Sequence, residues 1–211
     1  MHHAKVSTNY PWLPHNVDPT VQVPNEYKDM VLQPLGDVQS RHDAYMQACF
    51  DHYQQKNGKG ERCYDYESDR VALMLEQPRN MINFTYNGYS MTRIPDYLLE
   101  KLVAFFQANL GKQKAEKWGS GDIHTNHWEA PSTYLDIADP TLEGGGFALR
   151  QLVIHEVRKI VEDWTQQRQV STSVYGIRIY PTGSILAPHV DRNPLISSAI
   201  INVASDLEEP W

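Results

Sequence analysis

The residues best suited to chemistry are His189 and Asp191, which stand two apart inside the stretch from Tyr175 to Asn202. On a strand or at its exit, residues two apart point to the same side, so an imidazole nitrogen and a carboxylate oxygen can reach one metal ion. Two histidines and one carboxylate hold iron(II) on one face and leave three positions open. The pair therefore predicts two of three ligands, and no further histidine follows before Trp211.

The pattern His-x-Asp is weak by itself. With nine histidines in the chain, about one chance match is expected, and His127 with Glu129 is a second formal match. The flanking sequence strengthens the first match: the alternating run 173–180 predicts a strand, 181–183 a turn, and 195–203 a second strand. Strand, turn, ligand pair, turn and strand is what a metal site at the mouth of a jelly-roll barrel requires.

These residues also carry a family resemblance. Tyr180, then Gly183, then Pro188-His189-Val190-Asp191 resembles the signature of the prolyl 4-hydroxylase branch of the 2-oxoglutarate- and iron(II)-dependent dioxygenases, in particular its algal, diatom-type members. The resemblance extends roughly from Tyr86 to Trp211 and is sharp only from Tyr175 onward. It implies an α+β fold in which N-terminal helices pack on an incomplete double-stranded β-helix, or jelly-roll, barrel.

The resemblance also implies an activity. A member of this family decarboxylates 2-oxoglutarate to succinate while it hydroxylates peptidyl proline, with iron(II), O2 and ascorbate as the other requirements. It implies that His189 and Asp191 bind the metal and that Tyr180, Asn202 and Arg178 contact 2-oxoglutarate. For Arg178, an ion pair at the barrel edge is an equally good interpretation. The expected partner is a protein or peptide that contains proline.

A polar, aromatic segment from Gly119 to Asp139 precedes the strongest predicted helix. Function concentrates in such loops, and the corresponding segment of the family folds over the site. We therefore expect His127, Trp128 and Tyr134 to touch the peptide substrate. The alternative is a surface loop pinned by Trp128.

The sequence departs from the family pattern in two respects. Leu186 stands where many members have an aromatic residue. The distal histidine and the basic residue that pairs with 2-oxoglutarate would come later than Trp211, so we expect an N-terminal fragment of the dioxygenase domain. Because His124 and His127 precede the first barrel strand, we expect neither to replace the distal histidine. Two other interpretations are a non-catalytic jelly-roll domain that binds peptides or partner chains, and a chance His-x-Asp in an unrelated β-rich binding protein.

Composition limits the remaining classes. The chain has 211 residues, a net charge of -7 and a pI near 5.7. It has no Lys/Arg-rich stripe, which argues against a nucleic-acid partner, and no apolar run long enough to cross a membrane. The N-terminus lacks the apolar core of a signal peptide. Two cysteines, Cys49 and Cys63, and the glycosylation acceptor at Asn83 argue against a cytosolic protein, but two free thiols and a chance acceptor are an equally good interpretation. The resemblance favours the endoplasmic reticulum slightly over the cytoplasm, because prolyl 4-hydroxylases of this branch usually work there.

Apolar periodicity and proline positions predict the organisation of the chain. We expect a proline-punctuated arm and helical region over 1–88 and the N-terminal part of the dioxygenase domain over 89–211. Helices are predicted over 37–56 and 65–77, the second stopped by Pro78. Two more are predicted, one that starts near Pro95 and ends at Gly111 and one over 147–167.

Overall fold

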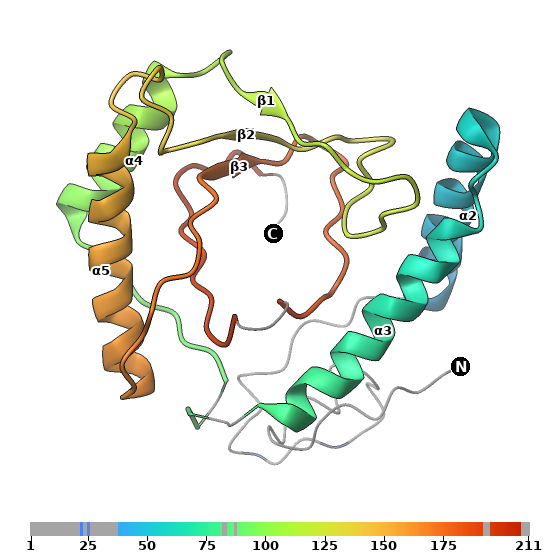
Figure 1. The fold of residues 1–211 in the computed structure, drawn as a ribbon, viewed down its shortest axis with the longest axis horizontal. Helices are drawn as coiled ribbons and strands as arrows, with labels where there is room; N and C mark the ends of the chain where they lie inside the picture. The colour runs from blue at the N-terminus through green and yellow to red at the C-terminus, as the bar shows by residue number, and fades with distance from the viewer. Residues whose placement is uncertain are drawn as a thin grey trace. The chain divides into compact units, whose positions relative to one another are not determined.

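The computed structural model describes residues 22, 25, 38–81, 84–86, 88–191 and 195–207 (Figure 1). They form two compact units, each assembled from separate stretches of the chain. The first unit comprises Met1–Gly88, Lys117–Ala130 and Gly183–Pro194, and the second comprises Tyr89–Glu116, Pro131–Thr182 and Leu195–Trp211. Almost all of the expected N-terminal arm, and Asn83 of the glycosylation acceptor, lie outside the described residues.

Two helices dominate the first unit. Helix α2 (Val38–Asn57) and helix α3 (Arg62–Asn80) are joined by a tight turn, and a disulfide links Cys49 to Cys63. Burial follows helical spacing, because the buried residues of α2 recur three and four positions apart on one face. A small core forms around the disulfide, with these members: Met46, Cys49, Tyr53, Cys63 and Ile123, with Tyr45, Tyr66 and Trp128 packed against them.

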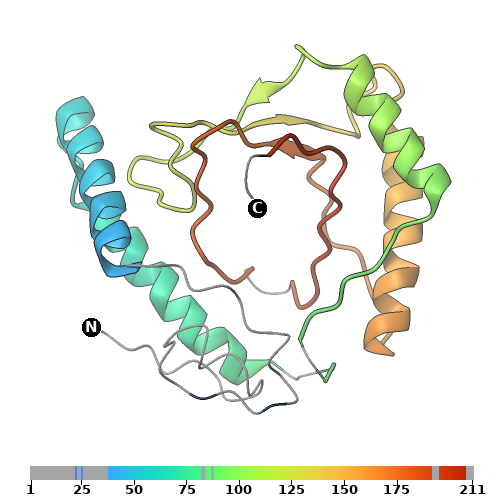
Figure 2. The same cartoon turned by 180° about the vertical axis from the view of Figure 1, so that it is seen from behind.

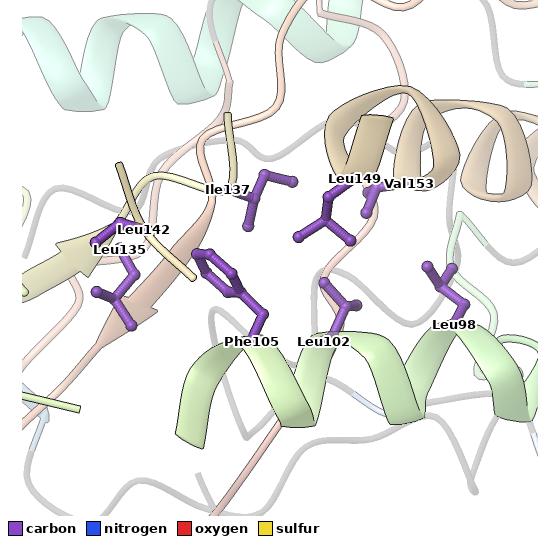
Figure 3. Packing of buried hydrophobic residues seen from close by; sticks show 8 residues of the cluster. All are labelled: Leu98, Leu102, Phe105, Leu135, Ile137, Leu142, Leu149 and Val153. Carbon is purple, nitrogen blue, oxygen red and sulfur yellow. The ribbon is translucent and has the colours of Figure 1, made fainter. Parts of the chain in front are cut away.

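The second unit has the larger apolar core. Helices α4 (Asp96–Ala108) and α5 (Phe147–Thr165) lie side by side in both views (Figures 1 and 2). Figure 3 shows the α4 side chains pointing toward α5 and toward the chain that follows β2. The buried cluster contains eight residues: Leu98, Leu102, Phe105, Leu135, Ile137, Leu142, Leu149 and Val153.

A three-stranded antiparallel sheet, in the order β1-β2-β3, completes the second unit. Its strands are β1 (Lys114–Ala115), β2 (Thr133–Leu135) and β3 (Ile177–Ile179). Side chains alternate between the two faces of a sheet. One face therefore carries Leu135, Ile177 and Ile179, which belong to the core or pack against it. The register pairs Tyr134 with Lys114 on one side and with Arg178 on the other, so the opposite face is polar.

Several predicted boundaries were wrong. Helix α3 runs two residues past Pro78, so the proline lies in the last turn and does not end the helix at Gln77. Helix α4 ends at Ala108, capped by Asn109 and not by Gly111. The buried Asn109 side chain donates to the carbonyl of Phe105 at 2.7 Å, so an amide satisfies a helix end where a glycine was expected.

The strand predicted over 195–203 is not formed in the described residues, and the predicted strand over 173–180 is reduced to three residues. The period of two is nevertheless real, since Ile201 and Val203 pack on the core while Ile200 is exposed. An alternating pattern sets which side chains face the core, whereas a strand also needs a neighbouring strand for its backbone hydrogen bonds. The three described strands do not close into a barrel, and the jelly-roll barrel stays a prediction.

Candidate functional site

The segment that carries His189 and Asp191 belongs to the first unit, where α3 holds its backbone. Arg70 donates from Nη1 to the carbonyl of Pro188 at 2.5 Å, and Gln77 donates from Nε2 to the carbonyl of Asp191. The two donors lie seven residues apart, which is about 10.5 Å along a helix. The two carbonyls are three residues apart, which is about 10 Å in extended chain. The spacing of the two donors on α3 therefore matches the spacing of the two carbonyls. The two bonds fix the backbone on both sides of His189.

Asn126 and its neighbours hold the same segment from the other side. The buried Asn126 side chain donates to the carbonyl of Gly183 at 2.9 Å and accepts from the amide of Ile185 at 2.7 Å. An antiparallel bridge pairs Thr125 with Leu186, and the amide of Ala187 donates to the carbonyl of His124 at 2.8 Å. This contact between 124–126 and 183–187 was not predicted, because nothing in the sequence indicates which distant segments pair.

The side chain of His189 has a defined orientation. Its Nδ1 donates to the carbonyl of Ala187 at 2.8 Å, because a carbonyl can only accept. The other nitrogen, Nε2, lies 4.0 Å from Oδ1 of Asp191. Two ligands at right angles on one metal, each about 2.1 Å away, are about 3 Å apart. A small rotation of either side chain therefore brings the pair into ligand geometry, and the chemistry of the two donors suits iron(II).

His124 lies next to His189, with ring centroids 5.5 Å apart and the rings nearly perpendicular. Its Nδ1 donates to Oδ1 of Asp122 at 2.9 Å, and its backbone amide donates to the same oxygen at 3.0 Å. Burial of Asp122 would raise its pKa, but these hydrogen bonds outweigh burial and hold the pKa below its usual value. Asp122 is therefore an ionised partner for His124 at neutral pH.

In the described part of the chain, no three histidine, cysteine, aspartate or glutamate side chains already surround one point closely enough to hold a metal. The His189 and Asp191 pair supplies two of the three predicted ligands, and the ring of His124 is in contact with that of His189. An ion would have to draw the side chains together from the positions that they occupy.

Two other predicted site residues, Tyr180 and Arg178, belong to the second unit. Arg178 donates to Oε1 of Glu116 through Nε at 2.9 Å and Nη2 at 2.7 Å, and its Nη1 donates to the hydroxyl of Tyr180 at 3.3 Å. Burial would lower the pKa of Arg178, but the bonds to Tyr180 and Glu116 raise it instead. The structure thus contains the ion pair that was the alternative interpretation of Arg178, on the polar face of the sheet.

The remaining predicted contacts also fall in the second unit. Tyr134 lies on β2 and not in a loop, and directly opposite Arg178, so the two share the polar face. Asn202 is exposed on the side of its segment that faces away from Ile201 and Val203. Contacts of Tyr180, Arg178 and Asn202 with 2-oxoglutarate, and of Tyr134 with a peptide, stay predictions.

His127 and Trp128 lie in the aromatic part of the first unit. His127 donates from Nε2 to the carbonyl of Asp122 at 3.0 Å and stacks on Trp118 with ring centroids 5.7 Å apart. Trp128 packs against Tyr45, at 5.3 Å between ring centroids, and Tyr53, at 6.5 Å. Burial lowers the pKa of His127, which favours the neutral ring. These contacts fit the alternative in which Trp128 pins the segment, and a substrate role for either residue stays a prediction.

Comparison with known proteins adds no relative. No protein-family model matches the chain, and no curated protein or solved structure matches it significantly. Among the described residues, no helix combines the length and the apolar character needed to cross a membrane.

Proposed function

We propose that the chain is an iron(II)- and 2-oxoglutarate-dependent dioxygenase that hydroxylates peptidyl proline. One observation carries the proposal: His189 is held by its Nδ1 so that Nε2 lies 4.0 Å from the carboxylate of Asp191. The histidine is thereby set in the tautomer that leaves a lone pair on Nε2, as a metal ligand requires. The hydrogen bonds from α3 and from Asn126 keep the ligand segment in place.

The chain's own residues have distinct tasks in this proposal. His189 and Asp191 hold the ion, and Ala187 fixes the histidine ring through its carbonyl. Bound iron supplies the activation of O2 that no protein side chain provides. Tyr180, which follows β3 in the second unit, is by the family resemblance a hydroxyl donor to 2-oxoglutarate, and its hydroxyl accepts a 3.3 Å bond from Nη1 of Arg178.

The overall reaction is balanced without a further reductant. One oxygen atom of O2 enters the C–H bond of proline as a hydroxyl group. The other enters succinate, which forms from 2-oxoglutarate as carbon dioxide leaves. The choice of proline comes from the family resemblance alone, so the test below uses a peptide in which both proline and other residues are available.

The test is an aerobic incubation of the 211-residue chain with iron(II), 2-oxoglutarate, ascorbate and a proline-rich peptide. We expect one succinate for each oxygen atom that mass spectrometry finds in the peptide. His189→Ala and Asp191→Ala should abolish both products, whereas His155→Ala, on exposed α5 surface, should leave them unchanged. Succinate formation that survives His189→Ala would contradict the proposal. Peptide binding without succinate would support the non-catalytic jelly-roll domain instead.

A further inference from the structure

We infer that His124 is the second histidine of a divalent-metal site that it forms with His189 and Asp191. The inference rests on the metal pair of the proposed function and adds a third ligand to that pair. It replaces the expectation that His124 is excluded by its position before the first strand.

Pairing of the two segments places the ligands on one face. Because Ala187 donates to the carbonyl of His124 and Thr125 pairs with Leu186, His124 lies directly opposite Ala187. Directly opposed residues of an antiparallel pair project to the same side, and residues two apart along a strand share that side. His189 is therefore the diagonal neighbour of His124. Ala187, the residue opposite His124, has a small side chain.

The distance between the two rings agrees with shared coordination. A metal about 2.1 Å from an imidazole nitrogen lies roughly 3.2 Å from the ring centre, so two imidazoles on one ion have centres about 4.5 to 5.5 Å apart. The centroids of His124 and His189 are 5.5 Å apart. Nε2 of His189 is 4.0 Å from Oδ1 of Asp191, so an ion would have to draw the three side chains together from the positions that they occupy.

Both histidines have the partners that metal-binding histidines have. A ligating histidine almost always donates its other N–H to a carboxylate or a backbone carbonyl, which fixes the ring and the tautomer. His124 donates from Nδ1 to the Asp122 carboxylate, and His189 donates from Nδ1 to the Ala187 carbonyl. In both rings the nitrogen left to bind a metal is Nε2. Asp122 is thus a positioning residue for His124.

All of these groups belong to the first unit, so the site needs no residue from the second. Arg70 and Gln77 of α3 hold the backbone on either side of His189, which makes the site rigid where its ligands are attached. Two imidazoles and one carboxylate suit a first-row divalent ion, with iron(II), cobalt(II) and zinc(II) as the candidates.

Cobalt(II) is the probe for the test, because its visible absorption bands report coordination in the absence of turnover. The full chain and its variants are titrated with cobalt(II), and circular dichroism checks that each variant is folded. We expect one ion per chain, and an affinity at least tenfold weaker for each of His124→Ala, His189→Ala and Asp191→Ala. His155→Ala, a histidine of the second unit, is the matched control and should bind as the parent does.

Two further measurements avoid dependence on the folding of His124→Ala. X-ray absorption of the cobalt-loaded parent should count two imidazole ligands. Asp122→Asn should weaken cobalt(II) binding by about ten- to a hundredfold while the count of imidazoles stays at two, as removal of an orienting partner does.

The outcomes separate this inference from the proposed function. In one outcome, His189→Ala and Asp191→Ala lose cobalt(II) while folded His124→Ala still binds it as well as the control His155→Ala. In that case His124 is not a ligand, and only the pair of His189 and Asp191 remains. A single imidazole in the X-ray absorption of the parent overturns the inference in the same way. A parent that binds no cobalt(II) overturns it too, and the succinate assay then decides the proposed function by itself.

Discussion

The two units of the chain are stabilised by different means. The second unit is built around eight buried apolar side chains from two helices, one strand and their connections. Among the described residues, the buried core cluster of the first unit has five members, two of which are the disulfide cysteines, and the later segments of this unit are attached in part through side-chain to backbone hydrogen bonds. Arg70, Gln77 and Asn126 make these bonds to the segment that carries His189.

The contrast has a consequence for where chemistry can be placed. An apolar core stabilises in proportion to the area that it buries and tolerates exchange of one apolar residue for another. A hydrogen bond to a particular carbonyl fixes a backbone position, so its loss changes geometry even where it costs little stability. The candidate metal residues lie in the unit that is held in the second way. The predictions below test that contrast, beginning with the largest effect.

Phe105→Ala should produce the largest loss of stability, because it empties the centre of the second unit. Phe105 is 2 % exposed, and truncation of a buried phenylalanine costs about 3–5 kcal/mol. Urea unfolding of the full chain measures the loss. Phe147→Ala is the control, since Phe147 is 74 % exposed and its removal should change the free energy of unfolding by less than about 0.5 kcal/mol. Equal losses in the two variants would mean that the core is not where the structure has it.

Removal of the disulfide by Cys49→Ser with Cys63→Ser should have the next largest effect. The bridge spans a sequence separation of 14 residues, and closing a loop of that size stabilises by about 3 kcal/mol. Thermal unfolding with and without a reducing agent measures it. The parent should fall to the level of the double variant when reduced, and the double variant should not respond. A parent that is insensitive to reductant would contradict the assignment of the bridge.

Asn126→Ala should cost about 1–3 kcal/mol, because it leaves the carbonyl of Gly183 and the amide of Ile185 without their partner. Hydrogen exchange at the Ile185 amide should accelerate more than exchange in α4 or α5. Asn202→Ala is the matched control, since the Asn202 side chain is exposed. If exchange accelerates uniformly through the chain, Asn126 stabilises the whole fold and does not hold one segment.

The smallest effect concerns the dependence of stability on pH. Burial would raise the pKa of Glu67, but hydrogen bonds from Arg70, at 2.6 and 2.8 Å, and from His42, at 2.9 Å, lower it overall. Its folded pKa is therefore below the unfolded value of about 4.3. The stabilisation is complete above that value and is lost as the pH falls through the folded pKa.

Urea unfolding of the parent and of Glu67→Gln from neutral to acid pH measures this contribution. The difference between the two should be largest near pH 7 and should shrink below about pH 4. A difference that stays constant over this range would show that Glu67 does not titrate with unfolding.

Some of this architecture could be predicted from the sequence, and the limits have physical causes. Apolar periodicity placed α2, α4 and α5 within two or three residues at most ends, because a helix is a local structure whose pattern repeats within a few residues. The end of α4 was missed because Asn109, whose side chain donates to the helix carbonyl of Phe105, is also held by the distant carbonyl of Glu143 at 2.9 Å. The strand predicted after Leu195 was wrong for a similar reason, because a strand needs hydrogen bonds to a neighbouring strand.

In the candidate site too, local spacing could be predicted from the sequence, whereas contacts between distant segments could not. That His189 and Asp191 share a side follows from their spacing, and their separation of 4.0 Å agrees with it. The approach of His124 to His189 depends on pairing between segments about sixty residues apart, which no local pattern reveals. Arg70 and Gln77 were missed altogether, because a polar residue on a helix has the same spacing whether it faces solvent or the backbone of another segment.

Each unit is assembled from separate stretches of the chain, so its parts are synthesised at different times. Helices α2 and α3 are finished by residue 80, but the segment that their polar face binds ends only at residue 191. At about 5–20 residues per second, a ribosome takes roughly 6–22 seconds to synthesise the intervening stretch. Early in that interval, the contacts that the described residues of the hairpin can make are the disulfide and the part of the small core that α2 and α3 supply. We expect a bridge between Cys49 and Cys63 that forms in this interval to restrict the hairpin before its later partners are made.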